Sequence, residues 1–136
     1  MKETFAIPAV GAIIVKHVGN EEYILIQTRE KNSCDGTDGL LEIPAGKIRE
    51  YENIFEALKR EVWEETGLHI TKIYGEEESQ FLDIDGNKTI LFNPYCVTQN
   101  LSGAYSLILS TFLCEAEGEL LEKTNEAENI RWMKRD

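Results

Sequence analysis

The sequence predicts an α/β (α+β) fold in which several β-strands pack against one amphipathic helix, and three observations carry this prediction. Residues 9–15 form a continuous apolar run rich in β-branched side chains, which is typical of a strand buried on both faces. Short strand-like runs recur along the rest of the chain, with turn-forming residues between them. Residues 54–66 instead carry apolar side chains at the spacing of one helix face.

The chain is predicted to form one domain over residues 1–136, because this length can build one hydrophobic core but is too short for two. Its formal net charge of -11 repels nucleic-acid phosphates and anionic membranes, so general nucleic-acid binding is not expected. The three cysteines lack CxxC spacing and indicate neither a disulfide framework nor a zinc site. The N-terminus lacks a signal-peptide layout and no apolar run could span a bilayer, so we expect a cytoplasmic protein without membrane contact.

The strands are expected on both sides of the helix in the sequence. Residues 32–39 are rich in turn formers and are predicted to form a loop. Residues 40–47 begin as a strand, but Pro44 cannot donate to a ladder and fits a strand end or edge. Residues 107–109, taken alone, would also suit a helix. Besides 9–15, the predicted strands are 23–28, 69–74, 79–84, 89–92, 95–98, 105–114 and 129–133.

The helix is predicted to run from about Ile54 to Thr66. Asn53 is expected to cap its N-terminus, with Glu56 at the third helical position of an Asn-led capping box. Gly67 is the expected residue just beyond its C-terminus. The core-facing stripe is formed by Ile54, Phe55, Leu58 and Val62.

An acidic arc lies beside this stripe. Glu61, Glu64 and Glu65 fall at i, i+3 and i+4 and therefore share one side of the helix. Their repulsion must be offset by cations, and Arg60, which can reach Glu64 and Glu56 at i±4, cannot neutralise all the carboxylates. The arc is either a solvated acidic face or a site for a divalent cation, and ligands made only of oxygen favour Mg²⁺ or Mn²⁺.

The residues around this arc resemble a complete Nudix box. Its fixed positions are Gly46, Glu52, Arg60, Glu61, Val62, Glu64, Glu65, Gly67 and Leu68. The chain thus resembles the Nudix hydrolase family, with MutT-like and ADP-sugar pyrophosphatase-like members, and the resemblance implies a Nudix fold with a mixed sheet sandwiched between helices. The C-terminal helix of that fold is expected to be missing or short, because the sequence stops at Asp136. Either the chain is truncated there, or an irregular segment or a neighbouring subunit supplies the second layer; an uncovered sheet face favours a homodimer.

The resemblance also implies roles for individual residues. The predicted metal ligands are the side chains of Glu61, Glu64 and Glu65 and the backbone carbonyl of Gly46. Three residues of the box are predicted to support these ligands: Arg60, Glu52 and Gly67. Arg60 would orient the glutamates of the box. The general base would be Glu64 within the box, or Glu126 outside it, with Glu128 as the second choice, although a surface-loop glutamate is the competing interpretation of Glu126. The candidates for substrate contact are Arg29, Glu42 and Lys47, each of which could equally be an ordinary strand-edge or surface residue.

The implied reaction is Mg²⁺- or Mn²⁺-dependent cleavage of the diphosphate bond in a nucleoside diphosphate derivative. Residues 41–47, LEIPAGK, resemble the segment that precedes the box in ADP-sugar pyrophosphatases, but Leu82 and Asp83 stand where ADP-ribose enzymes tend to carry a proline. The substrate is therefore left open between ADP-sugars and nucleoside triphosphates. Tyr95, Gln99 and Tyr105 could contact a base, or could be core and rim residues. The alternative function is a Nudix-fold module that binds a nucleotide without cleaving it.

Overall fold

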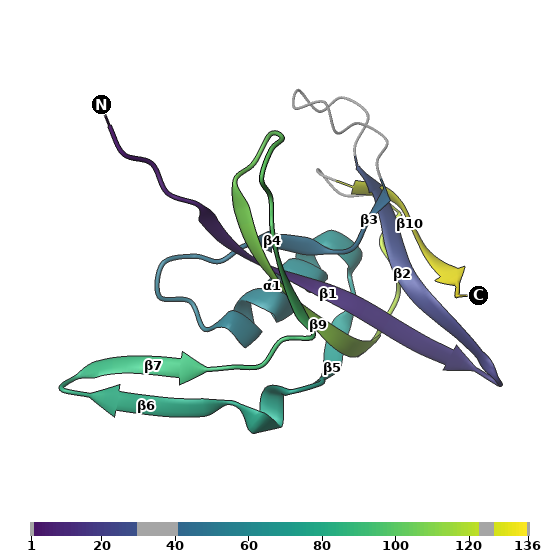
Figure 1. Cartoon of the computed structure of the whole chain (residues 1–136). Helices are drawn as coiled ribbons and strands as arrows, with labels where there is room; N and C mark the ends of the chain where they lie inside the picture. The colour runs from purple at the N-terminus through teal and green to yellow at the C-terminus, as the bar shows by residue number, and fades with distance from the viewer. Residues whose placement is uncertain (1, 30–40, 123–126, 136) are drawn as a thin grey trace.

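A mixed β-sheet forms the centre of the molecule (Figure 1). This computed structural model describes residues 2–29, 41–122 and 127–135, without the side chains of residues 29, 127 and 128. The main path of the sheet has the strand order β10-β2-β1-β9-β5. These strands are β1 (Ile7–Val18), β2 (Glu21–Arg29), β5 (His69–Ile73), β9 (Leu107–Glu117) and β10 (Ala127–Lys134). Because β1 pairs parallel with β9 and antiparallel with β2, the sheet is mixed, as the family resemblance implies.

Every strand predicted from the sequence overlaps an observed strand. The shorter strands are β3 (Leu41–Glu42), β4 (Ala45–Lys47), β6 (Gln80–Ile84), β7 (Asn87–Leu91) and β8 (Cys96–Gln99). Residues 107–109 are in β9, so the helical alternative for them is wrong. Residues 76–78 form a short 3-10 helix between β5 and β6. The predicted loop at residues 32–39 lies outside the described residues.

Helix α1 (Ile54–Thr66) has the bounds expected from the sequence, because its two ends are set by local signals. Asn53 Oδ1 accepts hydrogen bonds from the backbone N–H groups of Phe55 at 2.8 Å and Glu56 at 3.4 Å. Gly67 ends the helix in the left-handed conformation, with φ 81, and its N–H donates to the carbonyl of Trp63. The four residues of the predicted stripe are all buried, and the Phe55 ring packs edge-on against Phe112 of β9 at 5.4 Å between centroids.

Two short strands bring the segment before α1 against the sheet. β3 pairs with β2, where Glu42 lies opposite Gln27, and β4 pairs with β1, where Gly46 lies opposite Val10. Pro44 lies between these two strands, and its carbonyl accepts a hydrogen bond from the N–H of Ala12 at 2.9 Å. Pro44 therefore joins two strand ends, as its missing N–H requires. This arrangement places the Gly46 backbone beside α1.

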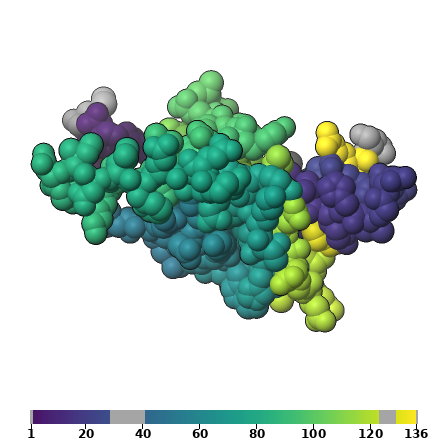
Figure 2. All heavy atoms as spheres, turned by 90° about the horizontal axis from the view of Figure 1, so that it is seen from below, coloured from purple at the N-terminus to yellow at the C-terminus, as the bar shows by residue number. Residues whose placement is uncertain are grey.

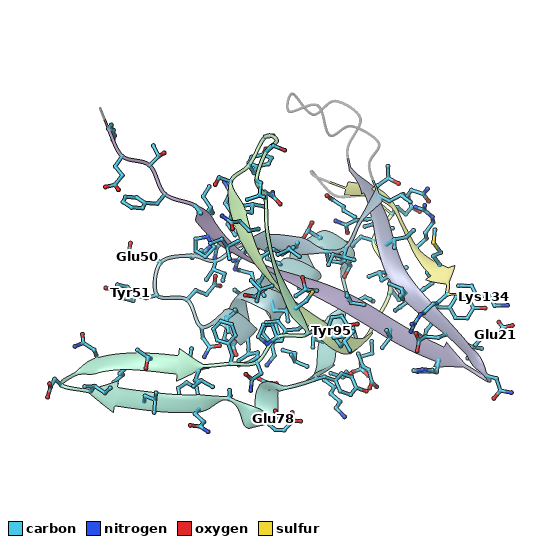
Figure 3. The ribbon with its side chains drawn as sticks, viewed as in Figure 1. Glu21, Glu50, Tyr51, Glu78, Tyr95 and Lys134 are labelled. Carbon is cyan, nitrogen blue, oxygen red and sulfur yellow. The ribbon has the colours of Figure 1, made fainter. Side chains whose placement is uncertain are left out.

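The hairpin formed by β6 and β7 is a separate two-stranded sheet at one end of the molecule, and the β1–β2 turn lies at the other (Figures 1 and 2). Glu21 and Lys134 form a 3.0 Å ion pair near that turn (Figure 3). Among the described residues α1 is the only α-helix, and it is too short and polar to cross a membrane. The second helical layer implied by the family resemblance is not supplied by these residues, and the homodimer stays a prediction.

Candidate active site

A groove of about 1010 Å³ runs alongside the C-terminal part of α1 and across β4 and β9. Its charged lining comes from Glu42, Lys47, Arg49, Arg60, Glu61, Glu64 and Glu65, and the Gly46 backbone belongs to the same wall. Its apolar lining comes from Ala9, Ile43, Ala45, Leu107, Leu109 and Leu121, with Tyr105 and Asn100 beside them. The three glutamates of the acidic arc thus face one groove, as their helical spacing predicts.

Gly46 is in direct contact with the carboxylate of Glu61. A Cβ atom on residue 46 would overlap that carboxylate, so the Glu61 carboxylate can take this position only because residue 46 has no side chain. The Glu61 carboxylate therefore lies against the Gly46 backbone. Carboxylate and backbone carbonyl oxygens are the ligand types that suit a hard divalent cation.

Arg60 joins the box acids to the loop before the helix. Its Nε and Nη2 atoms donate to the two carboxylate oxygens of Glu52, both at 2.8 Å, and its Nη1 donates to Glu61 at 2.6 Å and to Glu64 at 3.4 Å. Of the two acids within reach of Arg60 at i±4, the described contact is with Glu64, and Glu56 instead lies 3.9 Å from Lys59. The bidentate Glu52 pair, followed by the Glu61 pair, raises the pKa of Arg60. Arg60 is consequently a permanent cation that fixes Glu61 beside Gly46.

Glu52 is the acid whose ionisation is most strongly altered by this pairing. The hydrogen bonds from Arg60, with a further one from the Arg49 N–H, lower the pKa of Glu52 from 4.5 to about 2, although partial burial opposes the shift. Because the folded pKa lies below the ordinary value, the ionised carboxylate stabilises the fold above pH 4.5. This contribution is lost as the pH falls from 4.5 towards 2.

Glu52→Gln should therefore lower the melting temperature at neutral pH, and its deficit relative to the wild type should shrink as the pH falls from 4.5 towards 2. Thermal denaturation over a pH series measures this difference. Glu50→Gln is the matched control, since Glu50 is an exposed acid two residues away whose side chain points away from the fold (Figure 3). A Glu52→Gln deficit that stayed constant with pH would contradict the assigned role of the ion pair.

Glu64 and Glu65 differ sharply in their surroundings. The Glu64 side chain is 49% exposed. Among the described residues, it accepts a long hydrogen bond of 3.4 Å from Arg60. Glu65 is buried: its Oε1 accepts from Gln27 Nε2 at 2.9 Å and its Oε2 from the Ala45 N–H at 3.0 Å. Glu64 is thus the solvent-facing acid of the arc, and Glu65 is the one fixed by the sheet.

Gln27 of β2 is the residue of this site that the sequence analysis missed. It is fully buried, and its Nε2 also lies 3.4 Å from Glu42 Oε1. Gln27 Oε1 is the one buried side-chain polar atom in the described part of the chain that has no hydrogen-bond partner. Such an orphaned acceptor costs about 1–3 kcal/mol. The available signal was a polar residue two positions after Leu25, on the core-facing side of a predicted strand.

The chain matches the family model of the NUDIX domain over residues 7–136. It belongs to the Nudix family. A search of curated protein sequences finds no match. The Nudix match spans the sheet, α1 and the groove, and so covers every element described above.

Solved Nudix structures share this fold. A MutT Nudix hydrolase from Burkholderia pseudomallei superposes with a TM-score of 0.66 and 20% identity, covering 95% of this chain and 83% of that one. A MutT protein from Methanosarcina mazei Go1 gives a TM-score of 0.61 and 22% identity, covering 97% and 79%. The NUDIX domain of Shewanella oneidensis NrtR, complexed with ADP ribose, gives a TM-score of 0.61 and 14% identity, covering 96% of this chain and 73% of that one. At these identities the likeness shows the fold alone.

The Nudix box glutamates share a wall without converging on one point. Among the described residues, no three His, Cys, Asp or Glu side chains lie close enough together to hold a metal ion as they stand. Each acid is held by a neighbouring donor: Arg60 for Glu61 and Glu64, and Gln27 with Ala45 for Glu65. A carboxylate has about four lone-pair sites, so these hydrogen bonds are compatible with ligation. The predicted ligand set therefore stays a prediction that the donor chemistry fits.

The other candidate site residues fall into three groups: those that line this groove, those that lie outside it, and those whose side chains are not described. Lys47 and Glu42 line the groove, and the Lys47 Nζ atom lies 5.7 Å from the centre of the Tyr105 ring. Tyr95, labelled in Figure 3, and Gln99 are absent from the groove lining, and the Tyr95 side chain is exposed. The roles predicted for Arg29, Glu126 and Glu128 fall on side chains that lie outside the described residues.

Proposed function

We propose that this Nudix protein is a hydrolase that uses Mg²⁺ or Mn²⁺ to cleave the diphosphate bond of a nucleoside diphosphate derivative, either an ADP-sugar or a nucleoside triphosphate. The observation that supports this most strongly is the common wall formed by Glu61, Glu64, Glu65 and the Gly46 backbone. A solvated acidic surface would need neither a glycine pressed against one carboxylate nor a buried position for another. Both features are typical of a binding site and not of a solvated surface.

The net charge of -11 explains why the reaction would need a cation. A diphosphate is itself anionic, and a bound divalent ion would neutralise it and lower the pKa of an attacking water. Glu61, Glu64 and Glu65, with the Gly46 carbonyl, would hold this ion. Arg60 would keep Glu61 in place through its 2.6 Å hydrogen bond.

Glu64 is the proposed general base. A base must accept a proton from water in the groove, which requires a carboxylate that solvent can reach. Glu64 meets this condition with its half-exposed side chain, whereas Glu65 is buried. Glu126 and Glu128 stay the alternatives for this role.

The opposite side of the groove would take the organic part of the substrate. Leu107 and Leu109 supply an apolar surface, and Tyr105 adds an aromatic ring on which a base could stack. Lys47 lies between this ring and the box, where its ammonium group could meet a phosphate. A groove lined by acids, by basic side chains and by an aromatic ring suits a nucleoside joined to a diphosphate.

A substrate panel tests the proposal. With Mn²⁺ or Mg²⁺ present, the protein should release product from ADP-sugars or nucleoside triphosphates faster than from inorganic pyrophosphate, which lacks the base. Product analysis by chromatography measures this. No product from any member of a broad nucleotide panel would refute the proposed hydrolase.

The rival function is nucleotide binding without cleavage. Calorimetry that detects nucleotide affinity, together with an intact ligand after long incubation with Mn²⁺, would favour the rival.

A further inference from the structure

The amide of Gln27 connects two acids that come from different parts of the chain. Its Nε2 donates to Glu65 on α1 at 2.9 Å and lies 3.4 Å from Glu42 on β3. The β2–β3 register places Gln27 directly opposite Glu42, and α1 brings Glu65 over the same position. One buried NH₂ group is therefore shared between two carboxylates.

The orientation of this amide follows from its neighbours. A flipped side chain would place Gln27 Oε1 against two carboxylate oxygens, which would repel it. The observed orientation leaves Oε1 without a partner in the described part of the chain. The Gln27 Oε1 atom thus lacks a hydrogen bond, while Nε2 donates to both acids. An apolar side chain of the same size could not donate to either acid.

We propose that Gln27 is a positioning residue for Glu65. Its amide, together with the Ala45 N–H, would fix the Glu65 carboxylate at the groove wall as a ligand for the divalent cation. The inference rests on the proposed function. Residues that hydrogen-bond a metal ligand orient it and set its affinity, and their loss typically weakens metal binding by about 10–100-fold.

Gln27→Met tests this role. Methionine is unbranched and of similar length, so it fills the same space without donating a hydrogen bond. The matched control is Leu25→Met, a fully buried position on the same side of β2. Direct Mn²⁺ binding, measured by calorimetry without substrate, should weaken about 10–100-fold in Gln27→Met and stay unchanged in Leu25→Met. The KM for the substrate at saturating Mn²⁺ should stay unchanged in both.

A double variant tests whether Gln27 acts through Glu65. In a Glu65→Gln background, Gln27→Met should cause no further loss of Mn²⁺ affinity, since the two residues would act as one unit. If Gln27→Met does not fold, Gln27→Asn takes its place, because it keeps the amide but shortens the side chain by one methylene group.

Two results would overturn the inference: Mn²⁺ affinity in Gln27→Met equal to that of the wild type, or an equal further loss in the Glu65→Gln background. Failure of the proposed function would look different. In that case the wild type would bind Mn²⁺ yet release no product from the substrate panel, and the Gln27→Met comparison of Mn²⁺ affinity would still decide the role of Gln27.

Discussion

Glu64→Gln is expected to reduce kcat by about 10²–10⁴-fold, the range for the loss of a general base. The substitution keeps the size of the side chain and removes its ability to take a proton from water. Because Glu64 is half exposed and its described contact is one long hydrogen bond from Arg60, the fold should be retained. Steady-state kinetics at saturating Mn²⁺ measures the loss.

Glu56→Gln is the matched control for this experiment, because Glu56 is an exposed glutamate on the same helix that does not line the groove. Its kcat should equal that of the wild type. If the activity of Glu64→Gln recovers at high Mn²⁺ concentration, Glu64 is only a metal ligand. The base would then be Glu126 or Glu128.

Gly46→Ala is expected to damage the reaction much more than the fold. The added methyl group would meet the Glu61 carboxylate, which is the end of a flexible side chain and can move aside at little cost in stability. The moved carboxylate would then lie away from the Gly46 carbonyl. A displacement of about 1 Å at a reacting centre can cost on the order of 100-fold in rate, which sets the expected loss in kcat/KM.

Gly19→Ala should give the opposite pattern. Gly19 lies in the β1–β2 turn with φ 62 and has open space around it, so alanine there meets no atom but strains the backbone by about 1–2 kcal/mol. Its melting temperature should fall while kcat/KM stays unchanged. Equal activity of Gly46→Ala and the wild type would show that the contact between Gly46 and Glu61 has no part in the reaction.

Features of the fold that depend on neighbours in the sequence were predictable. Asn53, Gly67 and the spacing of Ile54, Leu58 and Val62 are local signals, and they gave the bounds of α1 and its buried face. The spacing of the acidic arc likewise predicted that its three glutamates share one side of α1, and all three line the groove.

Features that depend on distant segments could not be predicted in the same way. The Arg60–Glu52 pair joins the helix to the loop before it, across eight residues, and this loop has no repeating geometry from which the contact could be read. The Gln27–Glu65 contact spans 38 residues and depends on how α1 packs against β1 and β4, next to β2. The separation of the β6–β7 hairpin from the main sheet also follows from pairing between distant strands.

Hydrolysis in ¹⁸O-labelled water tests the central claim most directly. With Mn²⁺ and the best substrate of the panel, the account predicts that one ¹⁸O atom appears in one of the two phosphate-containing products, because water attacks a phosphorus atom of the diphosphate bond. Mass spectrometry of both products measures this. Bound nucleotide that remains intact and unlabelled in the presence of Mn²⁺ would contradict the account and identify the protein as a binding module.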